Sequence, residues 1–361
     1  MLDDLFAEAQ RQLTICNACR YCEGYCAVYP ALERKNLLTE GDITHLSNLC
    51  HDCRACFYAC MYAEPHEFRV NPPAVLSAVR RESYRSFMPE PPRGGPRGIR
   101  GAVLAIVVVA VVMAVTVGLT GGRQALWPYG GTADPYHVVP YAPLLILILL
   151  PSLWSSVLAV RALVRYWRAT YGPLRALWAP RALGRAVSDA ARLRYLRGGG
   201  DECYYPDDDP SPVRRRLHAA VFYGFLACVV STVSAAIMQD FLRIEPPYPY
   251  LSVPVISGTL GGAAMVIGCT GLTWFKRRGD PAPTDDRMAG HDLGFLTALN
   301  ALASTGILVL LARDSVVFPA LLIVHLATIV VCFGIFPYTK FMHFTYRFLA
   351  LVRDNLERTG G

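Results

Sequence analysis

Eight of the chain's 12 cysteines lie before residue 61, in two sets with the same spacing. The first set consists of Cys16, Cys19, Cys22 and Cys26, and the second consists of Cys50, Cys53, Cys56 and Cys60. Both read C-x2-C-x2-C-x3-C, a spacing typical of thiolates that hold [4Fe–4S] clusters. In paired runs of this kind the fourth cysteine binds the other cluster. The spacing therefore predicts one cluster on Cys16, Cys19, Cys22 and Cys60, and another on Cys50, Cys53, Cys56 and Cys26.

Zinc is the alternative ligand for closely spaced cysteines. A structural zinc site needs only two C-x2-C halves, so several cysteines of the two sets would stay idle. The spacing therefore favours iron–sulfur clusters, and we predict no catalytic residue beside them. The four other cysteines are interpreted as small apolar or contact residues: Cys203, Cys228, Cys269 and Cys332.

Three histidines in apolar surroundings form a second candidate group. His218 begins one apolar segment, and His325 and His343 lie in the last one. Ionisable residues within a membrane segment are rare and usually functional. If residues 316–345 form one helix, His325 and His343 share a face and lie about 27 Å apart, five turns along. That separation suits axial ligands of two stacked haems, and bis-histidine ligation suits electron transfer by b-type haem.

The last apolar segment resembles the last helix of the nitrate-reductase gamma-type cytochrome b, where two histidines recur at this spacing. The partner helix of that family carries two histidines ten residues apart, and here those positions are His218 and Cys228. The resemblance therefore implies one inner haem b on His218 and His343. His291 is the alternative to His218, and a second haem on His325 needs a partner that the sequence does not identify. A buried polar contact between helices is the other role open to each histidine.

Two kinds of structure must hold these residues. Overall, 53% of the chain is hydrophobic and only 17% is charged, which excludes disorder and argues against a single soluble domain. Charge-free intervals of about 20 residues, enough to cross a bilayer, recur six times. They predict transmembrane helices at about 101–122, 137–160, 217–239, 251–275, 292–312 and 316–345.

The predicted fold is all-α. Residues 1–92 are expected to form a cytoplasmic, helical ferredoxin-like head with two [4Fe–4S] clusters. Residues 93–361 are expected to form a six-helix transmembrane bundle that binds haem b. Within the head, residues 31–49 are predicted as one helix with a break at Gly41 and Asp42.

Basic residues are concentrated in alternate loops. Nine arginines lie between residues 161 and 197, whereas the opposite loops contain only Arg123, Arg243 and Arg313. The positive-inside rule then places both termini in the cytoplasm, in a multi-pass protein of the inner membrane. The same flanks explain the net charge of +7, so membrane lipid is expected as a partner and nucleic acid is not. Residues 1–14 lack the apolar core of a signal peptide, so the cysteines are expected in a reducing compartment that disfavours disulfides.

The strings CNACRYCEGYCAVYPALE and CHDCRACFYACMYAEPHEF resemble the tricarballylate- and citrate-utilisation protein B family. The flanking residues make this resemblance specific: Tyr21, Tyr25, Tyr29, Pro30, His51, Tyr58, Pro65, His66 and Phe68. The resemblance extends over nearly the full chain. It implies that the protein reoxidises the reduced FAD of a soluble tricarballylate-type dehydrogenase. Electrons would then pass through the clusters and haem b to quinone.

Two other functions stay open at this point. A quinol-oxidising subunit would send electrons inward to a cytoplasmic reductase, as in heterodisulfide-reductase-like systems. A redox sensor would keep the cofactors without turnover. Whether it reduces quinone or oxidises quinol, the chain is an electron-transfer component of an oxidoreductase system. The sequence does not set the direction of electron flow between these two functions.

Overall fold

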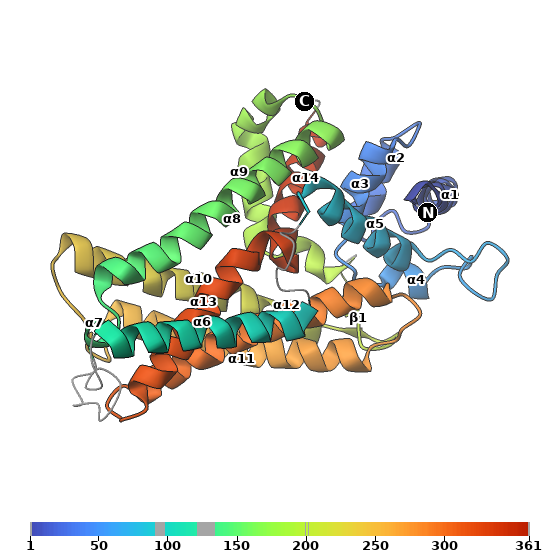
Figure 1. Cartoon of the computed structure of the whole chain (residues 1–361). Helices are drawn as coiled ribbons and strands as arrows, with labels where there is room; N and C mark the ends of the chain where they lie inside the picture. The colour runs from blue at the N-terminus through green and yellow to red at the C-terminus, as the bar shows by residue number, and fades with distance from the viewer. Residues whose placement is uncertain (1, 91–97, 121–133, 199, 201, 360–361) are drawn as a thin grey trace.

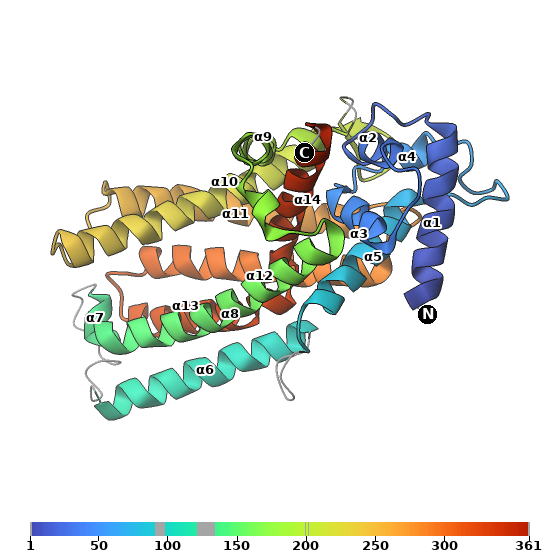
Figure 2. The same cartoon turned by 90° about the horizontal axis from the view of Figure 1, so that it is seen from above.

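The computed structural model describes residues 2–90, 98–120, 134–198, 200 and 202–359. The predicted domain boundary at 92/93 and the predicted end of the first span at 122 lie outside these residues. The helices of the head gather at one end of a helical bundle (Figures 1 and 2). The predicted all-α fold is confirmed, because the described strands amount to one antiparallel pair of two residues each.

The elements follow one another in a simple order. The head contains α1 (Leu2–Cys19), α2 (Val28–Glu33), α3 (Glu40–Leu49), α4 (Ala55–Tyr58) and α5 (Pro72–Phe87). The first half of the bundle contains α6 (Gly98–Thr120), α7 (Pro135–Val138) and α8 (Tyr141–Thr170). A connecting region follows, with η2 (Leu174–Trp178), α9 (Pro180–Ala191), η3 (Arg194–Arg197), β1 (Cys203–Tyr204) and β2 (Pro210–Ser211). The rest comprises α10 (Val213–Ala236), η4 (Ile237–Phe241), α11 (Val253–Arg278), α12 (Asp286–Leu311), α13 (Phe318–Ile335), η5 (Phe336–Tyr338), η6 (Lys340–Met342) and α14 (His343–Arg358).

Six described helices are long and apolar enough to cross a membrane, and the chain is therefore a multi-pass membrane protein. They are Gly98–Leu119, Tyr141–Thr170, Val213–Phe241, Val253–Arg278, Asp286–Leu311 and Phe318–Tyr338. Exposed apolar side chains such as Leu150 and Ile267 cover their outer faces, as expected of surfaces that contact lipid. Several of these helices extend beyond the predicted charge-free intervals, because a charged residue at the membrane border does not end a helix. The start of α12 is one case, since the Asp285 carboxylate caps it by accepting the Met288 N–H at 3.0 Å.

Glycines let α10 and α11 pack with their backbones in direct contact. A Cβ atom on Gly224 would lie 2.7 Å from the Gly261 carbonyl oxygen, and one on Gly261 would lie 2.6 Å from the Gly224 oxygen. Gly268 stands in the same relation to the Leu217 carbonyl, at 2.7 Å. Small residues at such a crossing replace side-chain packing by close van der Waals contact of the helices, which drives helix association in lipid.

We expect Gly261→Ala to lower the free energy of unfolding by about 1–3 kcal/mol, because the new methyl group meets backbone atoms that cannot rotate away. Gly290→Ala is the matched control, since Gly290 is exposed on α12 and its Cβ would meet nothing within 4 Å. The control should be neutral or slightly stabilising, because alanine favours a helix. Thermal unfolding of both variants in detergent measures the difference, and equal melting temperatures would contradict the close packing.

The last predicted span, 316–345, is wrong as a single helix. It ends at Ile335, two short 3-10 turns follow, and α14 begins at His343. Pro337 explains the break, because it has no N–H for the Phe333 carbonyl and its ring would clash with that carbonyl in a continuous helix. Ser155 of α8 donates its hydroxyl to the Phe333 oxygen instead. His325 and His343 therefore belong to different helices, and the spacing argument along one helix face does not apply.

The predicted helix over 31–49 is also interrupted, but at 34–39 rather than at Gly41 and Asp42. Thr39 caps α3: its Oγ1 accepts the Asp42 N–H at 3.1 Å, and the Asp42 carboxylate accepts the Thr39 N–H at 3.2 Å. This reciprocal capping box begins a helix. The Gly41–Asp42 pair thus lies in the first turn of α3 and does not break it.

The head and the membrane part share one hydrophobic core. Its buried members come from α1, α2, α3 and α5 of the head, and also from the end of α8, from α9 and from α14. Trp167, Ala350 and Val352 are fully buried in it. The head is therefore packed directly on the ends of the helices that follow it.

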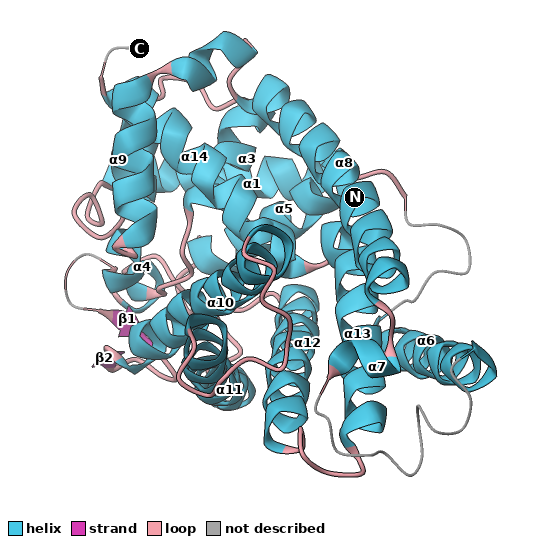
Figure 3. Ribbon diagram, turned by 90° about the vertical axis from the view of Figure 1, so that its left-hand side faces the viewer, coloured by secondary structure: helices cyan, strands magenta, loops and turns pink. Residues whose placement is uncertain are grey.

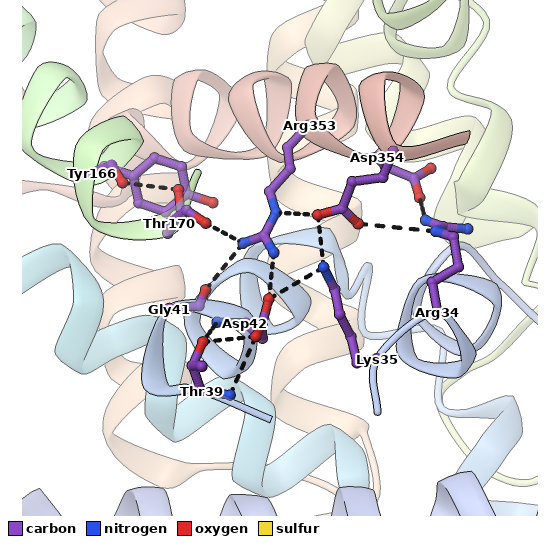
Figure 4. Close-up of polar contacts among 10 residues, drawn as sticks. Arg34, Lys35, Thr39, Gly41, Asp42, Tyr166, Thr170, Arg353 and Asp354 are labelled. Carbon is purple, nitrogen blue, oxygen red and sulfur yellow. Dashed lines mark hydrogen bonds and ion pairs between the residues drawn. The ribbon is translucent and has the colours of Figure 1, made fainter. Parts of the chain in front are cut away.

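Arg353 of α14 connects three parts of the chain in this region (Figure 4). Its guanidinium donates to the Asp42 carboxylate of α3, to the Gly41 carbonyl at 3.3 Å and to the Thr170 carbonyl of α8 at 2.5 Å. Its side chain is only 4% exposed. Burial alone would raise the pKa of Asp42, but hydrogen bonds from Thr39 and Arg353 lower it to about 2. Asp42 therefore stays ionised and holds the head against α14.

We expect Arg353→Ala to cost about 3–5 kcal/mol of stability, because it removes the buried guanidinium that pairs with the Asp42 carboxylate and donates to two carbonyls. The control is Arg11→Ala, whose pair with Glu8 is 43% exposed and should contribute about 1 kcal/mol or less. Because the folded pKa of Asp42 is depressed, the stabilisation is present above the ordinary value of 3.8 and is lost as pH falls toward 2. Thermal unfolding of both variants at neutral and acidic pH tests this, and an equal cost for the two arginines would contradict it.

Candidate iron–sulfur and haem site

The first cysteine group lies at the end of α1. Cys16 and Cys19 belong to its last turn, and Cys22 follows in the turn after it. Cys60, from the loop after α4, lies next to them: burial, and then Cys60 and Cys22, raise the pKa of Cys16 to about 12. Burial and Cys60 likewise raise the pKa of Cys22 to about 11. Thiols that resist ionisation because of burial and mutual repulsion suit a site where iron supplies the compensating positive charge.

The second group lies where α3 ends. Cys50 caps α3, Cys53 follows in the loop, and Cys56 lies in α4. Cys26, which comes shortly before α2, is their neighbour: after burial, Cys50 contributes most to a Cys26 pKa of about 12. Burial raises the pKa values of Cys53 and Cys56 well above the ordinary value, and Cys26 contributes to both. The fourth cysteine of each run thus lies among the thiols of the opposite run, and its role as a cluster ligand there stays a prediction.

No group of three or more His, Cys, Asp or Glu side chains in the described residues is placed to hold a metal ion. A [4Fe–4S] cluster needs a wider arrangement of thiolates than a single metal ion does. Each thiolate binds a separate iron atom, so the cysteine sulfur atoms lie farther apart than the ligands of one ion. The thiols of each predicted set lie close enough to influence one another's pKa values. A set of eight thiols fits iron–sulfur clusters.

Tyr29 lies between the two cysteine groups. It is 4% exposed, and its hydroxyl opposes the rise that burial causes in the pKa values of the Cys22 and Cys56 thiols. Burial, and then Cys56 and Cys16, raise the pKa of Tyr29 well above its ordinary value. The phenol therefore remains neutral between the two groups.

Arginines from three distant elements hold the backbone of the second group. Arg80 of α5 and Arg347 of α14 both donate to the Cys50 carbonyl, at 2.7 and 2.6 Å. Arg214 of α10 donates to the His51 carbonyl at 3.1 Å. The second group therefore lies in a positively charged environment, and the same three arginines line a cavity.

This cavity has a volume of about 310 Å³ and lies where the head meets the membrane helices. His218 and His343 both line it. The Nδ1–H of His343 donates to the Lys340 carbonyl at 2.6 Å, and a carbonyl partner of this kind commonly orients a metal-ligating imidazole. Burial, and then Lys340 and Arg347, hold the pKa of His343 well below its usual range, so its imidazole is neutral. The buried Nδ1 of His218 has no hydrogen-bond partner among the described residues, so this nitrogen is not committed to another polar contact.

The charges that line the cavity suit a ligand with negatively charged groups along one edge. Five cationic side chains face it, Arg80, Arg214, Lys276, Lys340 and Arg347, against three carboxylates, Asp52, Asp189 and Asp292. Asp292 of α12 binds Lys276 of α11 at 2.8 Å and also binds Lys340, just before His343. Asp52 of the head lies 3.6 Å from Lys276. The excess positive charge suits the two propionate groups of a haem, and the pair of neutral imidazoles suits its iron.

The structure separates the other two candidate histidines from this cavity. His325 of α13 bonds the Thr305 hydroxyl at 2.9 Å and packs on Gly306, where a Cβ would lie 3.1 Å from its ring. It therefore makes a contact between α12 and α13. His291 is exposed near the start of α12 and does not line the cavity. Among the predicted haem ligands, only His218 and His343 are brought together.

These features define a multi-pass membrane protein with an N-terminal domain of the iron–sulfur type. A family model described as "Citrate utilization protein B Fer4-like domain" matches residues 9–86, and one described as "Citrate utilization protein B" matches residues 94–360. The chain belongs to the citrate utilization protein B family, which confirms the predicted resemblance. The Citrate utilization protein B of Escherichia coli is 35% identical over 364 residues, which cover 98% of this chain and 93% of that protein. No solved structure matches the chain.

Proposed function

We propose that the chain is a membrane electron-transfer protein. It would take electrons from the reduced FAD of a tricarballylate-type dehydrogenase and deliver them to quinone through two [4Fe–4S] clusters and haem b. One observation carries this proposal: Arg80 and Arg347 bond the backbone of the second cysteine group and also line the cavity of His218 and His343. The family's link to citrate utilisation supports a tricarboxylate as the substrate of the partner enzyme.

The exposure of the two cysteine groups supports a flow of electrons from the surface of the head toward the membrane part. Cys19 of the first group is exposed, whereas Cys50 and Cys53 of the second are buried beside the cavity. Clusters held at these groups supply one-electron redox chemistry when bound. Positive charge close to a cluster stabilises its reduced form. The arginines at the Cys50 and His51 carbonyls therefore favour entry of electrons at the first group and exit at the second.

Anaerobic stopped-flow mixing tests the direction of flow. The purified holoprotein is mixed either with a reduced tricarballylate-type flavoprotein or with a short-chain quinol, and the cluster and haem absorbances are followed. We expect rapid reduction by the flavoprotein and rapid reoxidation by added quinone. Rapid reduction by quinol without reduction by the flavoprotein would favour a quinol-oxidising subunit. Absence of turnover with either partner would favour a sensor.

A further inference from the structure

A pocket rich in arginine lies on the same side of the membrane part as the head. Its volume is about 520 Å³, and it shares only Asp189 with the cavity of His218 and His343. Its five arginines come from α9, the residues that follow it, and α14: Arg185, Arg192, Arg194, Arg197 and Arg358. The electron-transfer proposal makes no use of these residues.

Only part of this positive charge is balanced within the protein. Arg194 pairs with Asp189 at 3.2 Å, and Arg358 pairs with Asp354 at 2.9 Å. Among the described residues, no carboxylate lies within ion-pair distance of Arg185, Arg192 or Arg197. Three guanidinium groups around one hollow repel each other, and an anion with several oxygens relieves that repulsion through paired N–H donors.

The position of α9 places this pocket at the level of lipid headgroups. In Figure 3, which looks roughly along α10 and α11, α9 runs across their direction. Tyr223 of α10 donates its hydroxyl to the carbonyl of Ala191, the last residue of α9, at 2.5 Å. Tyr223 lies ten residues beyond the start of α10, about 15 Å along it. The C-terminal end of α9 therefore touches a membrane-spanning helix within its apolar part.

Exposed apolar side chains on the same segment agree with that position. Val187 of α9 is 55% exposed, and Trp178, two residues before α9, is 85% exposed. A short amphipathic helix that lies across the spans with arginines and a tryptophan is typical of the membrane interface, where tryptophan is enriched. The arginine pocket is thus next to the surface where anionic headgroups are located.

We propose that this arginine pocket binds the phosphate-bearing headgroup of an anionic phospholipid. Free phosphate offers the same oxygen atoms to the guanidinium groups. The contact of α9 with α10 favours the lipid as their source, because a headgroup is held at this level by its acyl chains.

Lipid retention by the full-length protein tests the proposal. The double variant Arg192→Gln/Arg197→Gln is compared with Arg175→Gln/Arg181→Gln, which removes two exposed arginines of the same region outside the pocket. Both are purified in detergent from membranes that contain phosphatidylglycerol, and the bound lipid is quantified by mass spectrometry. We expect the pocket variant to retain at least about tenfold less phosphatidylglycerol than the control. Iron content should be equal in both, which separates this result from a failure of the cluster assignment.

Thermal unfolding of the wild-type protein provides the second measurement. Added phosphatidylglycerol should raise the melting temperature, and phosphatidylcholine or inorganic phosphate should not. These melting temperatures test lipid binding on the wild-type protein, so the test does not depend on whether the double variant accumulates. Equal lipid retention by the two variants would overturn the proposal. Equal stabilisation by inorganic phosphate and phosphatidylglycerol would overturn the lipid as the source of the anion.

Discussion

Replacing Cys56 by Ser is expected to lower the iron and acid-labile sulfide content of the purified protein by about half, since one of two clusters is lost. Electron transfer from a reduced flavoprotein to quinone should be abolished. Cys56 lies beside Cys53 and Cys26 in the second group, next to the cavity of His218 and His343. A hydroxyl is a poor iron ligand, so no remaining residue of this group replaces the thiolate.

Cys203→Ser is the matched control for this prediction. Cys203 is fully buried near Cys53, but its thiol donates to the Leu196 carbonyl at 3.1 Å, and Arg214 lies 3.3 Å from its sulfur. A serine can make both hydrogen bonds. We expect full iron and sulfide content in this variant. Unchanged iron and sulfide in Cys56→Ser, or an equal loss in Cys203→Ser, would refute the ligand assignment.

The second large effect concerns His343. We expect His343→Ala to remove the b-type band from the reduced-minus-oxidised spectrum and to leave the iron–sulfur content intact. The physical reason is the loss of one of the two imidazoles that line the cavity. His218→Ala should have the same effect.

His291→Ala and His325→Ala serve as controls, because neither ring lines the cavity. Both variants should keep the haem spectrum, although His325→Ala removes the hydrogen bond to Thr305. Loss of the b-type band in His325→Ala alone would place the haem elsewhere in the bundle. A wild-type protein without haem would remove this part of the proposal and leave the cluster part untouched.

Regular spacing explains which parts of the protein were predictable from the sequence. The cysteine runs repeat at short intervals, and each apolar span is continuous in the chain, so both can be recognised locally. Pro337 marks the break between α13 and α14 in the sequence, but the length and apolarity of residues 316–345 favour a single helix. Once that proline is taken into account, His325 and His343 need not share a helix.

The contacts that connect the two cysteine groups to the cavity were not predictable in this way. Arg347 lies 297 residues beyond the Cys50 carbonyl that it binds, and no local pattern specifies such a pair. Arg80 and Arg214 lie outside both cysteine runs and outside the basic loop at 161–197, so no local pattern marks them. Tyr29 appeared only as one residue in a string that resembles a family, and its place between the two groups depends on the tertiary fold.

The shared core has a consequence for biogenesis. All eight cysteines of the two groups are synthesised within the first 60 residues, but the core beneath them includes Ala350, Leu351 and Leu356 near the other end of the chain. During translation the head therefore leaves the ribosome long before the helix that completes its packing. Stable closure of the head, and with it protected cofactor loading, must wait until the sixth span has been inserted and α14 has returned to the side of the head. Assembly of the redox centre is in this way coupled to completion of the membrane domain.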